Sequence, residues 1–171
     1  MGVLVVAVAV VSAAVLTSGG GVVDAAPFAA VRPFSLSAVI SGQAPVSLAA
    51  APGRPVVLTF FASWCTPCLR ELPVIQRYWQ SVQAGSGAAP TVLGIDEMDQ
   101  RPDGPDLVRR TGVTFPSGYD HDGAVGRRWA VDGLPITAFI TPGGRVVAYH
   151  RGELDQAQLD VLVHRLVAAG Q

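Results

Sequence analysis

Residues 60–73 read FFASWCTPCLRELP and contain Cys65 and Cys68, the only two cysteines of the 171-residue chain. The compact β-rich run of residues 55–61 precedes the pair and is typical of a buried central strand. Residues 68–82 follow, with apolar side chains at helical spacing. The pair therefore lies between a predicted strand and a predicted helix, where it can be a structural staple, a metal clip or a reactive dithiol.

A reactive dithiol has the strongest physical basis at this position. Cys65 is expected at the helix N-terminus, where unpaired backbone N–H groups and the helix dipole stabilise the nucleophilic thiolate. Cys68 lies one turn further along, near enough to resolve a mixed disulfide formed by Cys65. Trp64 is expected to pack beside the pair, and Pro67 fits the first helical turn, where it needs no N–H partner.

The two structural readings have less support. A disulfide between residues three apart closes almost no loop, so it adds little stability. A zinc site needs four ligands, whereas the chain has no second cysteine pair and its three histidines, His121, His150 and His164, are scattered. We therefore predict no metal site and no dissociable cofactor, because the disulfide itself carries the electrons.

The rest of the sequence predicts a single α/β domain. Weak apolar alternation over residues 34–48 predicts an N-terminal β-hairpin. Further strands are expected at 91–95, 115–119, 136–141 and 145–150, and further helices at 103–110, 123–131 and 155–168. This order predicts a central mixed sheet, parallel at its centre, closed by an antiparallel hairpin and flanked by helices. Asp155 is expected to cap the last helix together with Gln158.

The first 23 residues carry no charged side chain. Their dense apolar run, residues 3–16, fits the core of a signal peptide, and extended to residue 23 it is just long enough to span a membrane. We predict a cleaved signal peptide or an uncleaved N-terminal anchor over 1–23, a linker over 24–33 and the folded domain over 34–171. Either N-terminal segment places the domain outside the cytoplasm, where disulfides persist. The formal net charge of −1 gives no electrostatic basis for binding nucleic acid.

Residues 53–73, GRPVVLTFFASWCTPCLRELP, resemble the active-site segment of the thioredoxin superfamily. They are more closely similar to the extracytoplasmic TlpA/ResA-like thiol-disulfide oxidoreductases, and the similarity extends over residues 34–168. The resemblance implies a thioredoxin-like fold. One departure from cytoplasmic thioredoxins is Thr59, where those proteins carry a buried aspartate; TlpA-like proteins often have asparagine there.

Three further features carry the resemblance. The segment GLPIT, residues 133–137, matches the family's cis-proline loop, which implies that Pro135 packs on the cysteine pair and that the backbone of Leu134 pairs with an incoming peptide. Glu71 matches the acidic residue that ResA-like members place near the cysteines, where it can shuttle protons. The alternative for Glu71 is a solvated helix carboxylate. Residues 142–145, PGGR, resemble the family's hairpin turn.

The resemblance implies dithiol–disulfide exchange with protein substrates in the bacterial cell envelope, by a secreted or N-terminally anchored protein. It favours a reductase of apocytochrome c cysteines in cytochrome c maturation, supplied with electrons by an upstream membrane redox donor. Contact with the membrane is expected only through an uncleaved N-terminus. The alternatives are a disulfide-forming oxidant of exported proteins, a copper-binding thioredoxin-fold chaperone and a non-catalytic interaction domain.

Several other polar or aromatic residues are not assigned to a site. His150, at the end of a predicted strand, is expected at the surface. Asp96 and Glu97 follow another predicted strand and are expected to be solvated loop residues. Trp129 is expected to be a core residue.

Overall fold

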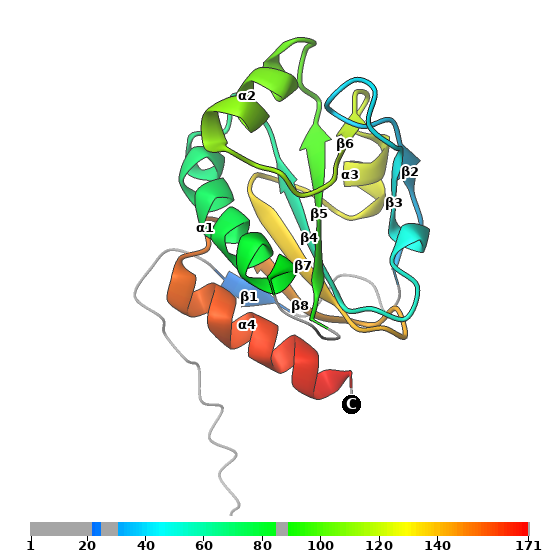
Figure 1. Ribbon diagram of the computed structural model, residues 1–171, viewed down its shortest axis with the longest axis vertical. Helices are drawn as coiled ribbons and strands as arrows, with labels where there is room; N and C mark the ends of the chain where they lie inside the picture. Colours follow the sequence, from blue (N-terminus) through cyan, green and yellow to red (C-terminus); the bar gives the residue numbers. More distant parts are fainter. Residues whose placement is uncertain (1–21, 25–30, 85–88, 171) are drawn as a thin grey trace, which may run out of the picture.

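The computed structural model describes residues 22–24, 31–84 and 89–170 (Figure 1). Most of the predicted signal or anchor segment and of the predicted linker lies outside these residues, so the boundaries at 23 and 33 stay predictions. Within the described part of the chain, no helix combines the length and the apolar character needed to cross a membrane.

The strands and helices predicted after residue 33 are present, and their ends differ from the predicted ones by at most three residues. The N-terminal hairpin is confirmed, with Ser35 opposite Ser47. In chain order the described elements are β1 (Val22–Asp24), β2 (Ser35–Leu36), β3 (Val46–Ser47), a 3-10 turn (Leu48–Ala50), β4 (Val56–Phe61), α1 (Thr66–Gln83), β5 (Thr91–Glu97), α2 (Asp103–Thr111), β6 (Ser117–Asp120), α3 (Ala124–Arg128), β7 (Ile136–Ile140), β8 (Val146–Arg151) and α4 (Gln156–Ala169).

The described strands form a mixed sheet in the order β1-β8-β7-β4-β5-β6, with β2 and β3 as a separate hairpin. β4, β5 and β6 run parallel, whereas β7 and β8 are antiparallel to their neighbours. β4 therefore lies inside the sheet, between β5 and β7, and all six of its residues are buried. This arrangement confirms the predicted α/β fold, parallel at the centre and closed by an antiparallel hairpin.

The side chains of β4 alternate between two apolar clusters, one on each face of the sheet. Val57 and Phe61 pack with apolar residues of α1, α2 and α4. Leu58 and Phe60 face the other side, where the Phe60 ring lies 5.9 Å from that of Trp129, centroid to centroid. Trp129 is fully buried, which confirms it as a core residue. Figure 1 shows α1 and α4 on one face, and α3 with the β2–β3 hairpin on the other.

Three polar residues predicted to be solvated, Asp96, Glu97 and His150, are instead buried. The prediction was wrong for the two acids because β5 continues to Glu97: Asp96 pairs with both β4 and β6, and Glu97 pairs with Asp120 of β6. It was wrong for His150 because this residue pairs with Thr137 of β7, and α4 packs across β7 and β8.

The start of α4 has the predicted cap. The Asp155 carboxylate accepts the backbone N–H of Gln158 at 2.8 Å, and the Gln158 side chain accepts the N–H of Asp155 at 3.0 Å. We expect Asp155→Ala to lower the free energy of unfolding by about 1 kcal/mol, because it leaves an orphan N–H at the helix start. Urea unfolding would measure the change. Asp160→Ala, an exposed site later on the same helix, is the control and is expected to change stability by less than about 0.5 kcal/mol; equal losses in the two variants would contradict the capping role.

Candidate functional site

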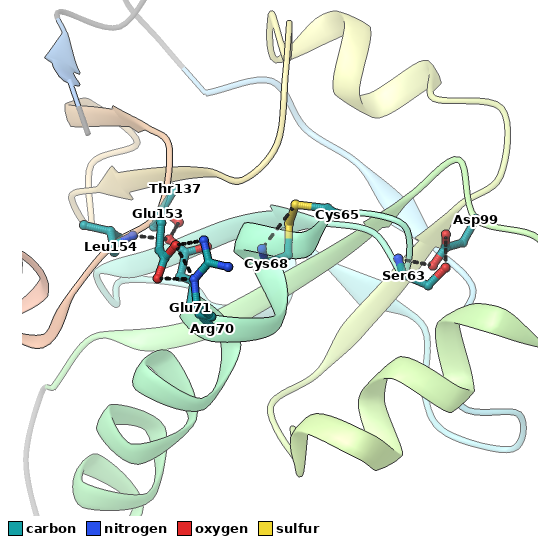
Figure 2. Close-up of a disulfide and its surroundings, with 9 residues drawn as sticks. All are labelled: Ser63, Cys65, Cys68, Arg70, Glu71, Asp99, Thr137, Glu153 and Leu154. Carbon is teal, nitrogen blue, oxygen red and sulfur yellow. Dashed lines mark hydrogen bonds and ion pairs between the residues drawn. A yellow bond between two sulfur atoms is a disulfide. The ribbon is translucent and has the colours of Figure 1, made fainter. Parts of the chain in front are cut away.

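The cysteine pair lies at the junction of β4 and α1 (Figure 2). β4 ends at Phe61, and Cys65 is the N-cap of α1. Cys65 and Cys68 form a disulfide, with exposed fractions of 4% and 0%. The Cys68 backbone N–H donates to the Cys65 sulfur at 3.2 Å, a contact drawn in Figure 2. Backbone N–H groups at a helix start stabilise a thiolate placed there, so this position suits a nucleophilic Cys65 once the disulfide is reduced.

The predicted docking loop lies beside the start of α1. The Leu134–Pro135 peptide bond is cis, and the Pro135 carbonyl accepts the N–H of Gly152 at 3.0 Å. A groove of about 450 Å³ joins this loop to the C-x-x-C segment. Its lining residues are Pro67, Leu134, Pro135, Gly152, Glu153, Asp155 and Gln158. The structure thus brings the predicted residues Leu134 and Pro135 to the same groove as Pro67, the residue before Cys68.

Trp64 lies immediately before Cys65, and its side chain is 63% exposed. It is the only aromatic residue among the exposed large apolar residues in the described part of the chain. An indole ring at this level of exposure buries little apolar area within the domain, so it contributes little to folding. A large exposed aromatic ring next to a reactive pair is a suitable contact for a partner protein.

Glu71, one turn after Cys68, is fully buried beneath the sheet, so a solvated helix carboxylate is ruled out. Its Oε1 atom accepts the N–H of Leu154 at 3.2 Å and the Thr137 hydroxyl at 3.4 Å. Oε2 has no hydrogen-bond partner among the described residues. Burial raises the pKa of Glu71 to about 8, against the opposing effect of those two hydrogen bonds.

On the surface, the neighbouring Arg70 donates hydrogen bonds to the Glu153 carboxylate at 2.8 and 3.0 Å (Figure 2). Two consecutive residues of α1, Arg70 and Glu71, therefore contact the turn between β8 and α4.

A row of polar side chains crosses the sheet on the face that α1 and α4 cover. Thr59, Thr137 and His150 are cross-strand neighbours on β4, β7 and β8. Thr137 bonds Glu71, and the ring of His150 lies 3.4 Å from the Glu153 carbonyl, measured from its Nε2 atom. Burial lowers the pKa of His150, so its ring is neutral at pH 7. Sequence reasoning missed His150, although its spacing of two from the apolar Ala148 of β8 was a signal for an inward-facing side chain.

A second buried acid near the cysteines was also missed by sequence reasoning. Asp99 is 1% exposed and bonds both the backbone and the side chain of Ser63, two residues before Cys65. The sequence places these residues 36 positions apart, and no local pattern connects them. Across the described ranges, no three side chains of His, Cys, Asp or Glu are grouped so that they could hold a metal ion.

Comparisons with known proteins agree with this geometry. The Redoxin family model matches residues 24–163. Thiol-disulfide oxidoreductase ResA of Oceanobacillus iheyensis is 28% identical over 118 residues, which are 69% of this chain and 60% of that protein. The chain thus spans about 60% of the length of this curated relative.

Solved structures share the fold. The structure of MTB dsbF in its mixed oxidized and reduced forms has a TM-score of 0.68 and 30% identity, and covers 78% of this chain and 94% of that one. A secreted Mycobacterium tuberculosis disulfide oxidoreductase, described as homologous to E. coli DsbE, has a TM-score of 0.64 and 24% identity over 79% of this chain and 95% of that one.

Proposed function

Because this chain belongs to the Redoxin family of the thioredoxin superfamily and carries a C-x-x-C disulfide at the start of a helix, we propose that it is a thiol-disulfide oxidoreductase acting on proteins outside the cytoplasm. The observation that carries the proposal is the 3.2 Å contact from the Cys68 N–H to the Cys65 sulfur at the N-cap of α1. That position lowers the free energy of the thiolate that attacks disulfides.

The proposed reaction has two exchange steps. In the first, the Cys65 thiolate attacks one sulfur of a substrate disulfide; a mixed disulfide forms, and the other substrate sulfur leaves as a thiolate. In the second, Cys68 loses its proton and attacks the Cys65 sulfur, which releases the second substrate thiolate. Two electrons pass from the Cys65–Cys68 dithiol to the substrate, and its two thiolates take up protons. The reverse sequence oxidises a substrate dithiol.

Glu71 is proposed as the acid–base group for the second step. A carboxyl whose pKa is raised to about 8 by burial gains and loses a proton near neutral pH, as a proton acceptor for a thiol must. Glu71 lies one helical turn after Cys68, on the buried side of α1. Thr59 of β4 cannot titrate, and the other buried acid near the cysteines, Asp99, lies on the opposite side of Cys65, where it bonds Ser63.

Substrate binding is proposed at the groove between α1 and the cis-proline loop. The Leu134 backbone precedes Pro135 at the edge of this groove, where it can pair with an extended peptide. Trp64 offers an exposed aromatic ring beside Cys65 for a second apolar contact. The partner proposed for this groove is a protein segment in an extended conformation that carries a cysteine.

Within this activity we place the protein with the reductases. The support is the similarity to proteins named thiol-disulfide oxidoreductase ResA and the resemblance of the active-site segment to the TlpA/ResA-like group. The proposed substrate is apocytochrome c before haem attachment, with a membrane redox protein as electron donor. A location in the bacterial cell envelope is proposed on the apolar N-terminus and on the similarity to a secreted oxidoreductase.

The reduction potential of the Cys65–Cys68 couple tests the activity and its direction. We expect equilibration with glutathione to give a value nearer to the roughly −270 mV of thioredoxin than to the roughly −120 mV of the oxidant DsbA. We also expect the protein to accelerate insulin reduction by dithiothreitol. A potential near that of DsbA, with oxidation of reduced ribonuclease, would reverse the proposed direction. Inactivity in both assays would contradict the activity, and tight copper binding that disappears in Cys65→Ser would favour a copper chaperone.

A further inference from the structure

Asp99, a residue of the loop after β5, binds the segment between β4 and the cysteines. Both oxygens of the Asp99 carboxylate bond Ser63: Oδ2 accepts its backbone N–H at 2.8 Å, and Oδ1 accepts its hydroxyl at 2.8 Å. Figure 2 shows the two bonds on the opposite side of Cys65 from Glu71. Inside the turn, the Cys65 N–H bonds the carbonyl of Ala62 at 3.2 Å. Asp99 therefore supplies the two shorter hydrogen bonds that fix this turn.

Asp99 is itself held in place. It follows the end of β5 by two residues and is almost completely buried. The Tyr119 hydroxyl donates to its backbone carbonyl at 2.7 Å. The Arg101 guanidinium lies over the Tyr119 ring, 4.2 Å from the ring centroid. A carboxylate anchored in this way can fix the direction of the segment that it binds, because its own position is set by β5 and β6.

Asp96 on β5 completes the surroundings of this carboxylate. It is fully buried, and burial raises its pKa to about 9, with a further contribution from Asp99. At neutral pH, Asp96 is therefore protonated and carries no negative charge. Gly104 of α2 leaves room for the Asp96 carboxyl, because a β-carbon at this position would overlap it. The other charged groups near enough to influence Asp96 are Arg101 and Asp103.

We propose that Asp99 is a positioning residue for the dithiol: by binding Ser63 it holds Cys65 over the N-terminus of α1. The proposal rests on the thiol-disulfide function proposed above and adds a determinant of thiol reactivity that the C-x-x-C segment does not contain. The thiolate is stabilised only while its sulfur stays close to the free N–H groups of the helix start. When Ser63 is released, the sulfur moves relative to those groups and the thiolate becomes less stable.

The direction in which the pKa of Cys65 changes distinguishes a positioning role of Asp99 from an effect of its charge. Removing a nearby negative charge on its own lowers the pKa of a thiol, because the thiolate is then repelled less. Loss of positioning has the opposite effect and raises the pKa of Cys65. We expect Asp99→Ala to raise this pKa by about one, which corresponds to about a tenfold shift in the thiol–thiolate equilibrium. Asp99→Asn keeps an acceptor for the Ser63 N–H and is expected to restore most of the wild-type value.

The experiment measures the pH dependence of iodoacetamide alkylation of the reduced full chain, together with the reduction potential in glutathione buffer. Asp99→Ala is expected to raise the alkylation pKa and to make the potential less oxidising, because the reduced form loses its stabilised thiolate. Ser63→Ala keeps the Asp99 charge and loses only the hydroxyl bond, so a smaller rise is expected. Asp103→Ala is the control: it removes a carboxylate that lines a groove together with Ser63, without a bond to Ser63 among the described residues.

A fall in the alkylation pKa in Asp99→Ala, or an unchanged value in both Asp99→Ala and Ser63→Ala, would overturn the positioning role. If Asp99→Ala does not fold, Ser63→Ala decides the question, because it keeps the Asp99 side chain and a rise in the alkylation pKa is still expected; an unchanged value in Ser63→Ala would then overturn the positioning role. Alkylation uses a small reagent and no protein substrate. A wild-type protein that is inactive on insulin would therefore contradict the proposed function, while the pKa shift would still test the role of Asp99.

Discussion

Cys68→Ser is expected to accumulate as a covalent complex with its protein substrate, whereas Cys65→Ser is expected to form no such complex. The reason is the different environment of the two sulfurs. Cys65 caps α1 and receives the N–H of Cys68, so it is the better stabilised thiolate; Cys68 is fully buried within the helix and is placed to attack Cys65. Without the resolving thiol, the mixed disulfide on Cys65 persists.

Non-reducing electrophoresis and mass spectrometry of the reduced variants, mixed with a disulfide-containing protein such as insulin, would measure the trapping. Turnover is expected to fall by about 10³-fold or more in Cys65→Ser. The Cys65→Ser/Cys68→Ser double variant is the control, and because the chain has no other cysteine, any adduct identifies the sulfur that formed it. Trapping on Cys68 in the Cys65→Ser variant would exchange the two roles.

Glu71→Gln is expected to be more stable than the wild-type protein above pH 8 and similar to it near pH 4.5. Burial raises the pKa of Glu71 from 4.5 to about 8, so the folded protein keeps a proton that the unfolded chain loses across this range. The favourable contribution is complete below pH 4.5 and is lost as the pH rises to about 8, because the unfolded state then binds fewer protons than the folded state. The loss is on the order of 4 to 5 kcal/mol. Glutamine stays neutral and does not undergo it.

Urea unfolding at a series of pH values from 4 to 9 would measure this difference. Glu153→Gln is the matched control, because it makes the same substitution on a partly exposed carboxyl that pairs with Arg70 at the surface. An exposed ion pair contributes about 0–1 kcal/mol to the free energy of unfolding, so a small change is expected. Asp96 and Glu97 also have raised pKa values through burial, so wild-type stability is expected to decline further in the same direction as the pH rises. Parallel pH profiles for wild type and Glu71→Gln would contradict a buried neutral Glu71.

The Glu71→Gln variant is also expected to slow thiol-disulfide exchange, since glutamine cannot accept a proton from Cys68.

The local sequence predicted most of the fold because its signals act over short distances. Alternating apolar residues in β4 and helical spacing in α1 report which sides are buried, and the packing follows that pattern. The main error in a strand was the end of β5. The composition around Asp96 and Glu97 predicts a loop, and only pairing with neighbouring strands keeps them in the sheet, Asp96 with β4 and β6 and Glu97 with β6. A propensity cannot register a partner strand that lies far away in the chain.

In the candidate site, too, some features follow from the local sequence and others appear only in the folded structure. The sequence by itself determined the cysteine pair and its place between a strand and a helix, because spacing along one helical turn is a local property. The separate roles of Cys65 and Cys68 stay predictions. Only the tertiary structure decided that Glu71 is a buried acid with a raised pKa and that Asp99 holds Ser63. Both depend on the removal of water and on hydrogen bonds between segments more than thirty residues apart, which form only when the sheet and its covering helices come together.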